Sequence, residues 1–98
     1  MSMHNPPHPG EFIQATYLQP FKLSCQLLAQ KLDVASVTVE QIINKQATVT
    51  PEMALRLSKS LGRTPESWLA MQDAYDLWQV KKTIELDKVE KVHFEEAA

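Results

Sequence analysis

The scarcity of glycine is the feature that most restricts how this chain can fold. Gly10 and Gly62 are the only glycines in 98 residues. Tight hairpin turns need residues that accept a positive φ, usually glycine, so a hairpin-rich β fold is excluded. The same scarcity excludes a glycine-rich phosphate-binding or dinucleotide-binding loop. These exclusions favour a helical chain.

Length and composition set the scale of the fold. A chain of 98 residues forms about one domain with one modest core. Its hydrophobic fraction of 44% and charged fraction of 22% are typical of globular domains. The single cysteine, Cys25, excludes an internal disulfide and a Cys-based zinc site, and it fits a reducing cytosol. The chain has neither a signal peptide nor an apolar run of about 18 residues. We therefore expect a cytoplasmic protein without cofactor, metal or membrane contact.

Helix start and stop signals divide the chain. Thr50-Pro51-Glu52 and Thr64-Pro65-Glu66 each place a capping hydroxyl, a proline and an acid where a helix begins. Gly62 lies where a left-handed residue ends a helix. The apolar spacing predicts five helices, over residues 9–18 (ending before Pro20), 25–32, 37–44, 51–61 and 65–82.

Three regions follow from this pattern. Residues 1–8 are proline-rich and form a flexible arm, residues 9–82 form the helical domain, and residues 83–98 form a tail. The apolar residues of the tail fit neither the helical nor the strand period well. The tail therefore extends the last helix, forms a short strand or frays. The many β-branched residues of 37–44 are compatible with a helix or a strand, and the helical context decides for a helix.

The stretch from Cys25 to Asn44 has the spacing of a helix-turn-helix. Ala29 is small enough for a second helix to come close, and Leu27, Leu28 and Leu32 complete the expected buried face. Asp33 begins the turn and Val34 plugs it. Val39 and Ile42 then anchor the second helix, the recognition helix of about 36–44. Such a helix lies in the major groove of DNA.

Four motifs in order resemble the HigA/VapI antitoxins, a phage-repressor-like (XRE) helix-turn-helix family. They are His8-Pro9-Gly10-Glu11, the segment from Thr50 to Leu57, Thr64-Pro65-Glu66-Ser67-Trp68-Leu69, and Ala74-Tyr75-Asp76-Leu77. The resemblance covers about residues 8–80. It implies an all-α, five-helix, lambda-repressor-like domain with a C-terminal extension. It also implies a homodimer that represses its own operon and neutralises a small RelE/HigB-like mRNA-cleaving toxin.

The chain departs from the family pattern at three places. Asp33 and Lys45 stand where the family usually has glycine, and aspartate tolerates a left-handed backbone better than lysine. Glu40 and Gln41 replace the Arg or Asn often found there. Gln41 suits adenine, whereas Glu40 suits a cytosine amino group but is repelled by phosphates.

Candidate DNA contacts come from the exposed positions of this unit. The base-reading candidates are Ser36, Val37, Thr38, Glu40 and Gln41. The phosphate-contact candidates are Gln26, Lys31, Lys45 and, by the resemblance, Asn44. The formal net charge is −2, but residues 22–63 carry six basic and three acidic side chains, so the middle of the chain is mildly basic.

Three further features have a plain and a functional interpretation. Trp68, Tyr75 and Trp78 are core residues or part of a homodimer interface, because aromatics are enriched at interface centres. Both can hold, with Trp68 inside and Trp78 at the interface. Cys25 begins a helix, which could lower its pKa, but an inert thiol is the simpler interpretation. His4 and His8 are expected to be solvated or capping residues.

Three functions remain open at this point. The first is the antitoxin and operon repressor, and the second is a stand-alone helix-turn-helix transcription regulator. The third is a protein-binding module that has lost DNA binding, which Glu40 and the net charge would suit. An enzyme is not expected, because the sequence shows no paired carboxylates, no Ser/His/Asp arrangement and no phosphate loop.

Overall fold

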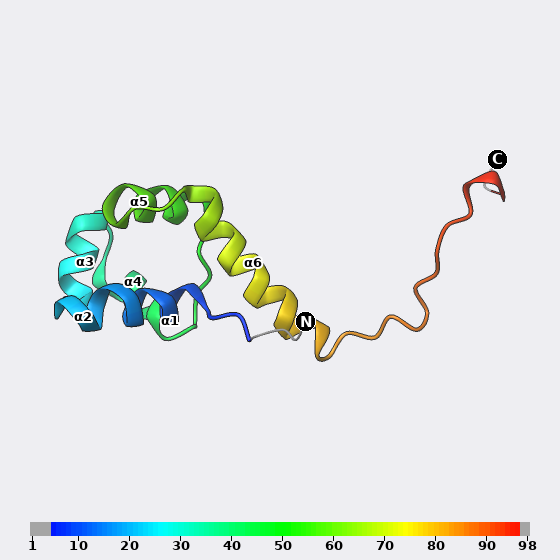
Figure 1. Cartoon of the computed structure of the whole chain (residues 1–98), viewed down its shortest axis with the longest axis horizontal. Helices are drawn as coiled ribbons and strands as arrows, with labels where there is room; N and C mark the ends of the chain where they lie inside the picture. Colours follow the sequence, from blue (N-terminus) through cyan, green and yellow to red (C-terminus); the bar gives the residue numbers. More distant parts are fainter. Residues whose placement is uncertain (1–4, 97–98) are drawn as a thin grey trace.

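A computed structural model describes residues 5–96, and these residues contain helices and no strand. One rod is built from α1 (Pro9–Ile13), the π-helical turn η1 (Gln14–Leu18) and α2 (Gln19–Phe21). It is followed by α3 (Cys25–Leu32), α4 (Ser36–Ile43), α5 (Pro51–Leu61) and α6 (Pro65–Lys81). The predicted five-helix domain is therefore confirmed, with α6 running diagonally away from the other helices (Figure 1).

The sequence predicts that the first helix ends before Pro20, and this prediction is wrong. A proline inside an α-helix clashes with the carbonyl four residues earlier. Here the preceding turn is π-helical, and the amide of Gln19 donates to the carbonyl of Gln14, five residues back. This wider turn carries the rod past Pro20 to Phe21. Lys22, with a φ of 57°, then ends it.

Hydroxyl caps begin three of the helices, as the sequence predicts. The hydroxyl of Ser24 accepts from the amide of Leu27, and that of Thr50 accepts from Met53 at 3.2 Å. Thr64 does the same for Ser67 at 3.0 Å. Each cap satisfies one amide that has no partner within its own helix.

The core lies between the rod and the four helices that follow. It contains the expected anchors Ala29, Val39 and Ile42, whereas Leu27, expected on the buried face of α3, is 38% exposed. The buried hydrophobic residues are Ile13, Leu18, Leu28, Ala29, Leu32, Val39, Ile42, Val49, Met53, Ala54, Leu57 and Trp68.

His8 is not part of a loose arm. Its side chain is 2% exposed, and its Nδ1 accepts a 2.9 Å hydrogen bond from the amide of Gly10, so it caps the first helix as expected. Its ring also meets that of Tyr75 edge to face, with centroids 4.9 Å apart. His8 therefore ties the start of the rod to α6. His4 lies outside the described residues.

A buried glutamine fastens the loop that follows α4. The Oε1 of Gln72 accepts a 2.8 Å hydrogen bond from the amide of Val49, and its Nε2 donates to Asp76. Because both polar ends of Gln72 have partners, its burial carries no unsatisfied group. The contact fixes the approach of the chain to α5.

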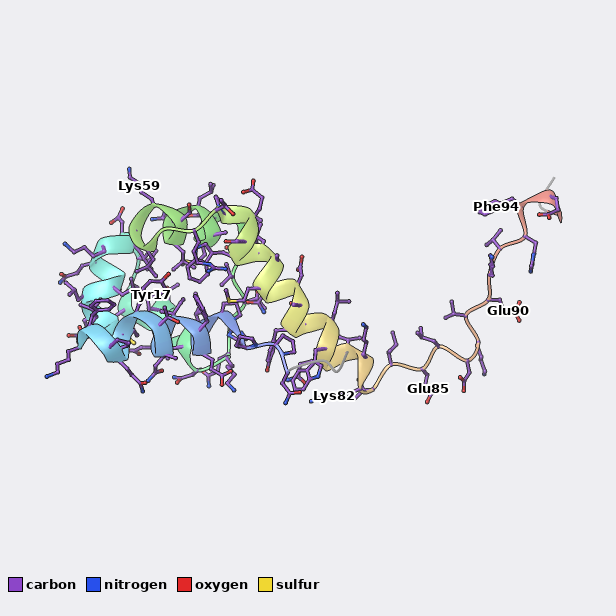
Figure 2. All side chains as sticks on the ribbon, in the orientation of Figure 1. Tyr17, Lys59, Lys82, Glu85, Glu90 and Phe94 are labelled. Carbon is purple, nitrogen blue, oxygen red and sulfur yellow. The ribbon has the colours of Figure 1, made fainter. Side chains whose placement is uncertain are left out.

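The segment after α6 leaves the domain as an extended tail. Residues 82–93 contain no helix or strand, and the short 3-10 turn η2 (Phe94–Glu96) follows. Glu85 lies just beyond the end of α6, and the side chains of Glu90 and Phe94 lie progressively farther from the helical domain (Figure 2). The sequence leaves three alternatives for this tail. Residues 83–96 neither extend the last helix nor form a strand, so two of these alternatives are wrong.

Candidate DNA-binding site

The recognition helix α4 is held on the core by one face and is open on the other. Val39 and Ile42 are buried, whereas Val37 and Gln41 are exposed one helical turn apart. Residues four apart lie on the same side of a helix. The two side chains therefore form one outward face, which is what a base-reading helix needs.

The other base-reading candidates surround this face. Ser36 and Thr38 are half-buried, and Glu40 is exposed. Glu40 lines a small groove between α4 and the first helical rod, together with Gln14, Lys22 and Asn44. Glu40 therefore faces the groove beside the first helix, in which Lys22 also lies.

Cys25 lines the same groove. Burial raises the pKa of its thiol above the ordinary value, and the negative charge of Glu40 raises it further. The sequence suggests that the helix N-terminus could lower this pKa, but burial and Glu40 outweigh that effect. The thiol is free and half-buried, which agrees with the inert interpretation.

The phosphate-contact candidates divide into two groups. Gln26 is exposed on the first turn of α3, and Asn44 and Lys45 are exposed where α4 ends. Lys31 lies elsewhere, on a groove between α3 and α5 that includes no residue of α4. The structure therefore does not bring Lys31 together with the recognition helix.

Both positions where the family pattern has glycine are left-handed here. Asp33 ends α3 with a φ of 60°, and Lys45 follows α4 with a φ of 63°. At Lys45 the amide donates to the carbonyl of Ile42, and the next amide, of Gln46, donates to Gln41. This is the hydrogen-bond pattern by which a right-handed helix ends at a residue with a left-handed backbone. The strain expected for a lysine in this conformation is therefore present.

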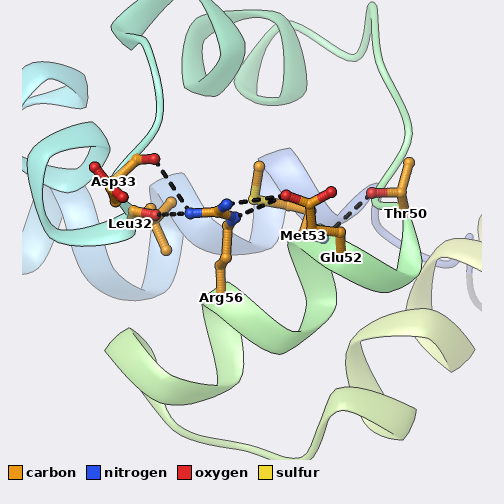
Figure 3. Close-up of polar contacts among 6 residues, drawn as sticks. All are labelled: Leu32, Asp33, Thr50, Glu52, Met53 and Arg56. Carbon is orange, nitrogen blue, oxygen red and sulfur yellow. Dashed lines mark hydrogen bonds and ion pairs between the residues drawn. The ribbon is translucent and has the colours of Figure 1, made fainter.

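Arg56 on α5 holds the turn of the helix-turn-helix. Its guanidinium donates to the carbonyl of Leu32 at 2.8 Å and to that of Asp33 at 3.1 Å. The carboxylate of Glu52, one turn earlier on α5, accepts from the other side at 2.9 Å (Figure 3). Arg56 thus satisfies carbonyls at the end of α3 that lack helical partners.

Sequence reasoning missed this role of Arg56. The spacing of Glu52 and Arg56 is a sign of an ion pair along one helix. Nothing local in the sequence indicates that the same arginine reaches residues more than twenty positions earlier. That contact depends on how α5 packs against α3.

The aromatic residues of α6 lie in different environments. Trp68, a candidate for the dimer interface, is 0% exposed, and its Nε1 donates to the carbonyl of Gly62 at 3.0 Å. Its side chain is core and has no surface for a second copy. Tyr75 and Trp78 are half-buried, with ring centroids 6.2 Å apart.

The exposed half of α6 includes two apolar residues that sequence reasoning did not single out. Leu77 is 59% exposed and Val80 is 50% exposed, and because they are three positions apart they lie on the same side of α6. The ammonium of Lys82 lies 3.5 Å from the centroid of the Trp78 ring. An apolar strip of this kind on a projecting helix is typical of a dimer surface.

In the part of the chain that the structure describes, no group of three His, Cys, Asp or Glu side chains could hold a metal ion. None of the described helices combines the length and the apolar character needed to cross a membrane.

Comparison with known proteins places this geometry in context. No family model matches the chain. The HTH-type transcriptional regulator YddM of Escherichia coli (strain K12) is 33% identical over 92 residues, which are 94% of this chain and 97% of that protein. Antitoxin HigA-1 of Vibrio cholerae is 36% identical over 72 residues, which are 74% of this chain and 68% of that protein.

A solved structure extends the comparison to three dimensions. The structure of Pseudomonas aeruginosa antitoxin HigA with the higBA promoter matches with a TM-score of 0.79 and 30% identity. The match covers 90% of this chain and 99% of the other.

Proposed function

Since the chain belongs to the HigA-type family of helix-turn-helix antitoxins and regulators, we propose that it is an antitoxin that binds operator DNA as a dimer and represses its own operon. The outward face of α4 carries this proposal, because Val37 and Gln41 are exposed on a helix fixed from behind by Val39 and Ile42. A relative in the same family has been solved with its promoter.

The roles of the side chains follow from their positions. Gln41 suits bidentate bonds to adenine, and Val37 suits contact with a thymine methyl group. Ser36 and Thr38 lie beside them near the start of α4. Gln26, Asn44 and Lys45 suit phosphate contacts, which fix the register on the duplex without reading sequence. In this proposal the chain acts as a regulator and not as an enzyme.

The proposed dimer forms through the exposed half of α6. Leu77 and Val80 present the exposed apolar strip, and the half-buried rings of Tyr75 and Trp78 come from the same part of the helix. Two-fold symmetry would present two copies of α4 about 34 Å apart, one turn of DNA, and so read a palindromic site. A single helix-turn-helix makes too few contacts for tight binding.

A mobility-shift titration against the region upstream of the gene tests the repressor. The expected result is a specific shift that weakens between about 50 and 200 mM salt, because each neutralised phosphate releases counterions. Gln41→Ala should weaken specific binding about 10-fold, within the usual range for one bidentate base contact.

Gln30→Ala is the matched control, since Gln30 is an exposed glutamine on α3 and is not among the contact candidates. No shift at low salt would reject the repressor and favour the protein-binding module. An equal loss for Gln41→Ala and Gln30→Ala would reject the assigned role of Gln41.

The same proposal includes neutralisation of a small RelE/HigB-like toxin. Family membership supports it, and the acidic side chains of Asp73 and Asp76 on α6 suit a basic partner. Co-expression with the product of the neighbouring gene, followed by size-exclusion chromatography, tests it. A stable complex that relieves growth arrest is expected. Operator binding without such a complex would favour a stand-alone regulator.

A further inference from the structure

A groove between α3 and α5 is not explained by DNA binding. It has a volume of about 740 Å³ and is lined mostly by leucine, including Leu27, Leu55 and Leu61. Leu55 is 62% exposed although it belongs to a helix that otherwise buries its apolar side chains well. Leucine side chains gathered along an open groove suit an apolar partner, because they would be removed from water when the groove is filled. We call it the α3–α5 groove.

The rim of the α3–α5 groove is basic. Lys31 and Lys59 stand on it from α3 and α5, and both are exposed. Arg56 also lines the groove, but its guanidinium is held by Glu52 and two carbonyls. The two lysines therefore give the groove its available positive charge, which suits an acidic occupant with apolar side chains.

The tail of this chain has that chemistry. Residues 83–95 include four acidic residues and two lysines. Its apolar side chains are all exposed, and Phe94 is 80% exposed. They are Ile84, Leu86, Val89, Val92 and Phe94. Five exposed apolar side chains in one segment favour docking of the tail on an apolar surface, since burial removes them from water.

The tail leaves from the wrong end of the molecule to fill its own groove. It departs from the far end of α6, whereas α3 and α5 lie at the opposite side of the domain (Figure 1). In an antiparallel pair through the exposed half of α6, the end of one helix at Lys81 lies beside the middle of the other, near Ala74, about 14 Å along that helix from its start at Pro65. Pro65 follows directly after α5, which forms one wall of the groove.

The tail is long enough for this route. Fourteen residues from 83 to 96 span at most about 46–50 Å when extended, whereas the eleven residues of α5 are about 16 Å long. The tail can therefore pass along the first half of α6 of a second copy, about 14 Å, and then run along the whole of the α3–α5 groove.

We propose that the tail of each copy docks in the α3–α5 groove of the other copy, with its leucine, valine and phenylalanine side chains on the groove leucines and its acids near Lys31 and Lys59. This inference rests on the proposed dimer. The exchange of tails brings the dimer contact onto α3, the first helix of the helix-turn-helix. Dimer formation and the position of the DNA-binding unit are thereby linked.

A photo-crosslink locates the tail directly. Phe94 is replaced by p-benzoylphenylalanine in the full chain, and the protein is irradiated. Crosslinks between two copies that map to residues 23–33 or 55–61 are expected. Crosslinks within one chain, or crosslinks between copies that map elsewhere, would overturn the proposal. The same replacement at Phe21, an exposed phenylalanine on α2, is the control and should give no crosslink to the groove.

Sedimentation equilibrium measures the contribution of the contact. Leu86→Asp on the tail and Leu55→Asp in the groove should each raise the dimer Kd at least 10-fold. The double variant should be little weaker than either single variant, because both remove the same contact. All three positions, including the control Phe21→Asp, are exposed, so the core is preserved.

The possible failures can be told apart. A wild-type chain that stays monomeric would overturn both the proposed dimer and the tail exchange. A dimer that survives Leu55→Asp and Leu86→Asp but is lost with Trp78→Asp would overturn the tail exchange alone. In that case dimerisation through α6 and operator binding would stand.

Discussion

Gly10 on α1 lies directly against the main-chain carbonyl of Ile42 on α4. A β-carbon on Gly10 would overlap the carbonyl oxygen of Ile42 and come within 2.8 Å of the Cα of Ile43. Both neighbours are backbone atoms, so no side-chain rotation can make room. The absence of a side chain at Gly10 therefore sets how closely the first helix approaches the recognition helix.

Gly10→Ala is expected to destabilise the fold by about 3 kcal/mol, because α1 must move away from α4. Urea unfolding measures the change. Gly62→Ala is the control, since its φ of 96° strains an alanine but no atom lies within 4 Å of the added carbon. A smaller cost at Gly10 than at Gly62 would contradict a tight contact between the two helices.

His8 is expected to make stability depend on pH. Burial lowers the pKa of His8 below its ordinary value of 6.5, and Lys45 lowers it further, while Asp76 and Glu11 oppose the change. As the pH falls below about 6.5, the unfolded chain takes up a proton before the folded chain does. Stability is therefore full above this pH and is lost as the pH falls through the folded pKa.

Urea unfolding at several pH values between 5 and 8 tests this expectation. His8→Asn keeps a capping side chain but cannot titrate, so it should flatten the dependence. His93→Asn, on the exposed tail, should leave the dependence unchanged. An unaltered pH dependence in His8→Asn would show that another group is responsible.

Arg56 is expected to matter more for its carbonyl contacts than for its ion pair. Arg56→Met should cost about 1–2 kcal/mol, the range for hydrogen bonds to a charged, partly exposed group. It should also weaken operator binding, because the turn between α3 and α4 loses its support. Glu52→Gln removes only the exposed ion pair and should cost less than about 1 kcal/mol. Equal costs for the two variants, measured by urea unfolding, would contradict this ranking.

Lys45 is expected to combine strain with a role in binding. Lys45→Gly should stabilise the fold by about 1 kcal/mol, because glycine accepts the φ of 63° without the cost of a left-handed side chain. It should also reduce the salt dependence of operator binding by about 0.9 in log–log slope, the value for one phosphate. Lys45→Ala should lower the slope by the same amount as Lys45→Gly, but it should not stabilise the fold. Equal stability of the two variants would argue against strain at this position.

Local signals were enough to predict most helix boundaries. Thr50, Thr64 and the prolines after them act within one turn of the chain, so α5 and α6 begin where the sequence places them. The inward positions of Ala29, Val39 and Ile42 follow from the helical period. The same period leaves Val37 and Gln41 outward, so the candidate base-reading face was also accessible from the sequence.

Contacts between distant segments could not be predicted in this way. The passage of the first helix through Pro20 depends on a π-helical turn, and the burial of His8 depends on Tyr75 of α6. Arg56 reaches the end of α3 only because α5 packs beside it. The sequence determined where helices form, since caps and periodicity act over a few residues. The tertiary structure decided which side chains meet, because packing joins residues that are far apart in the chain.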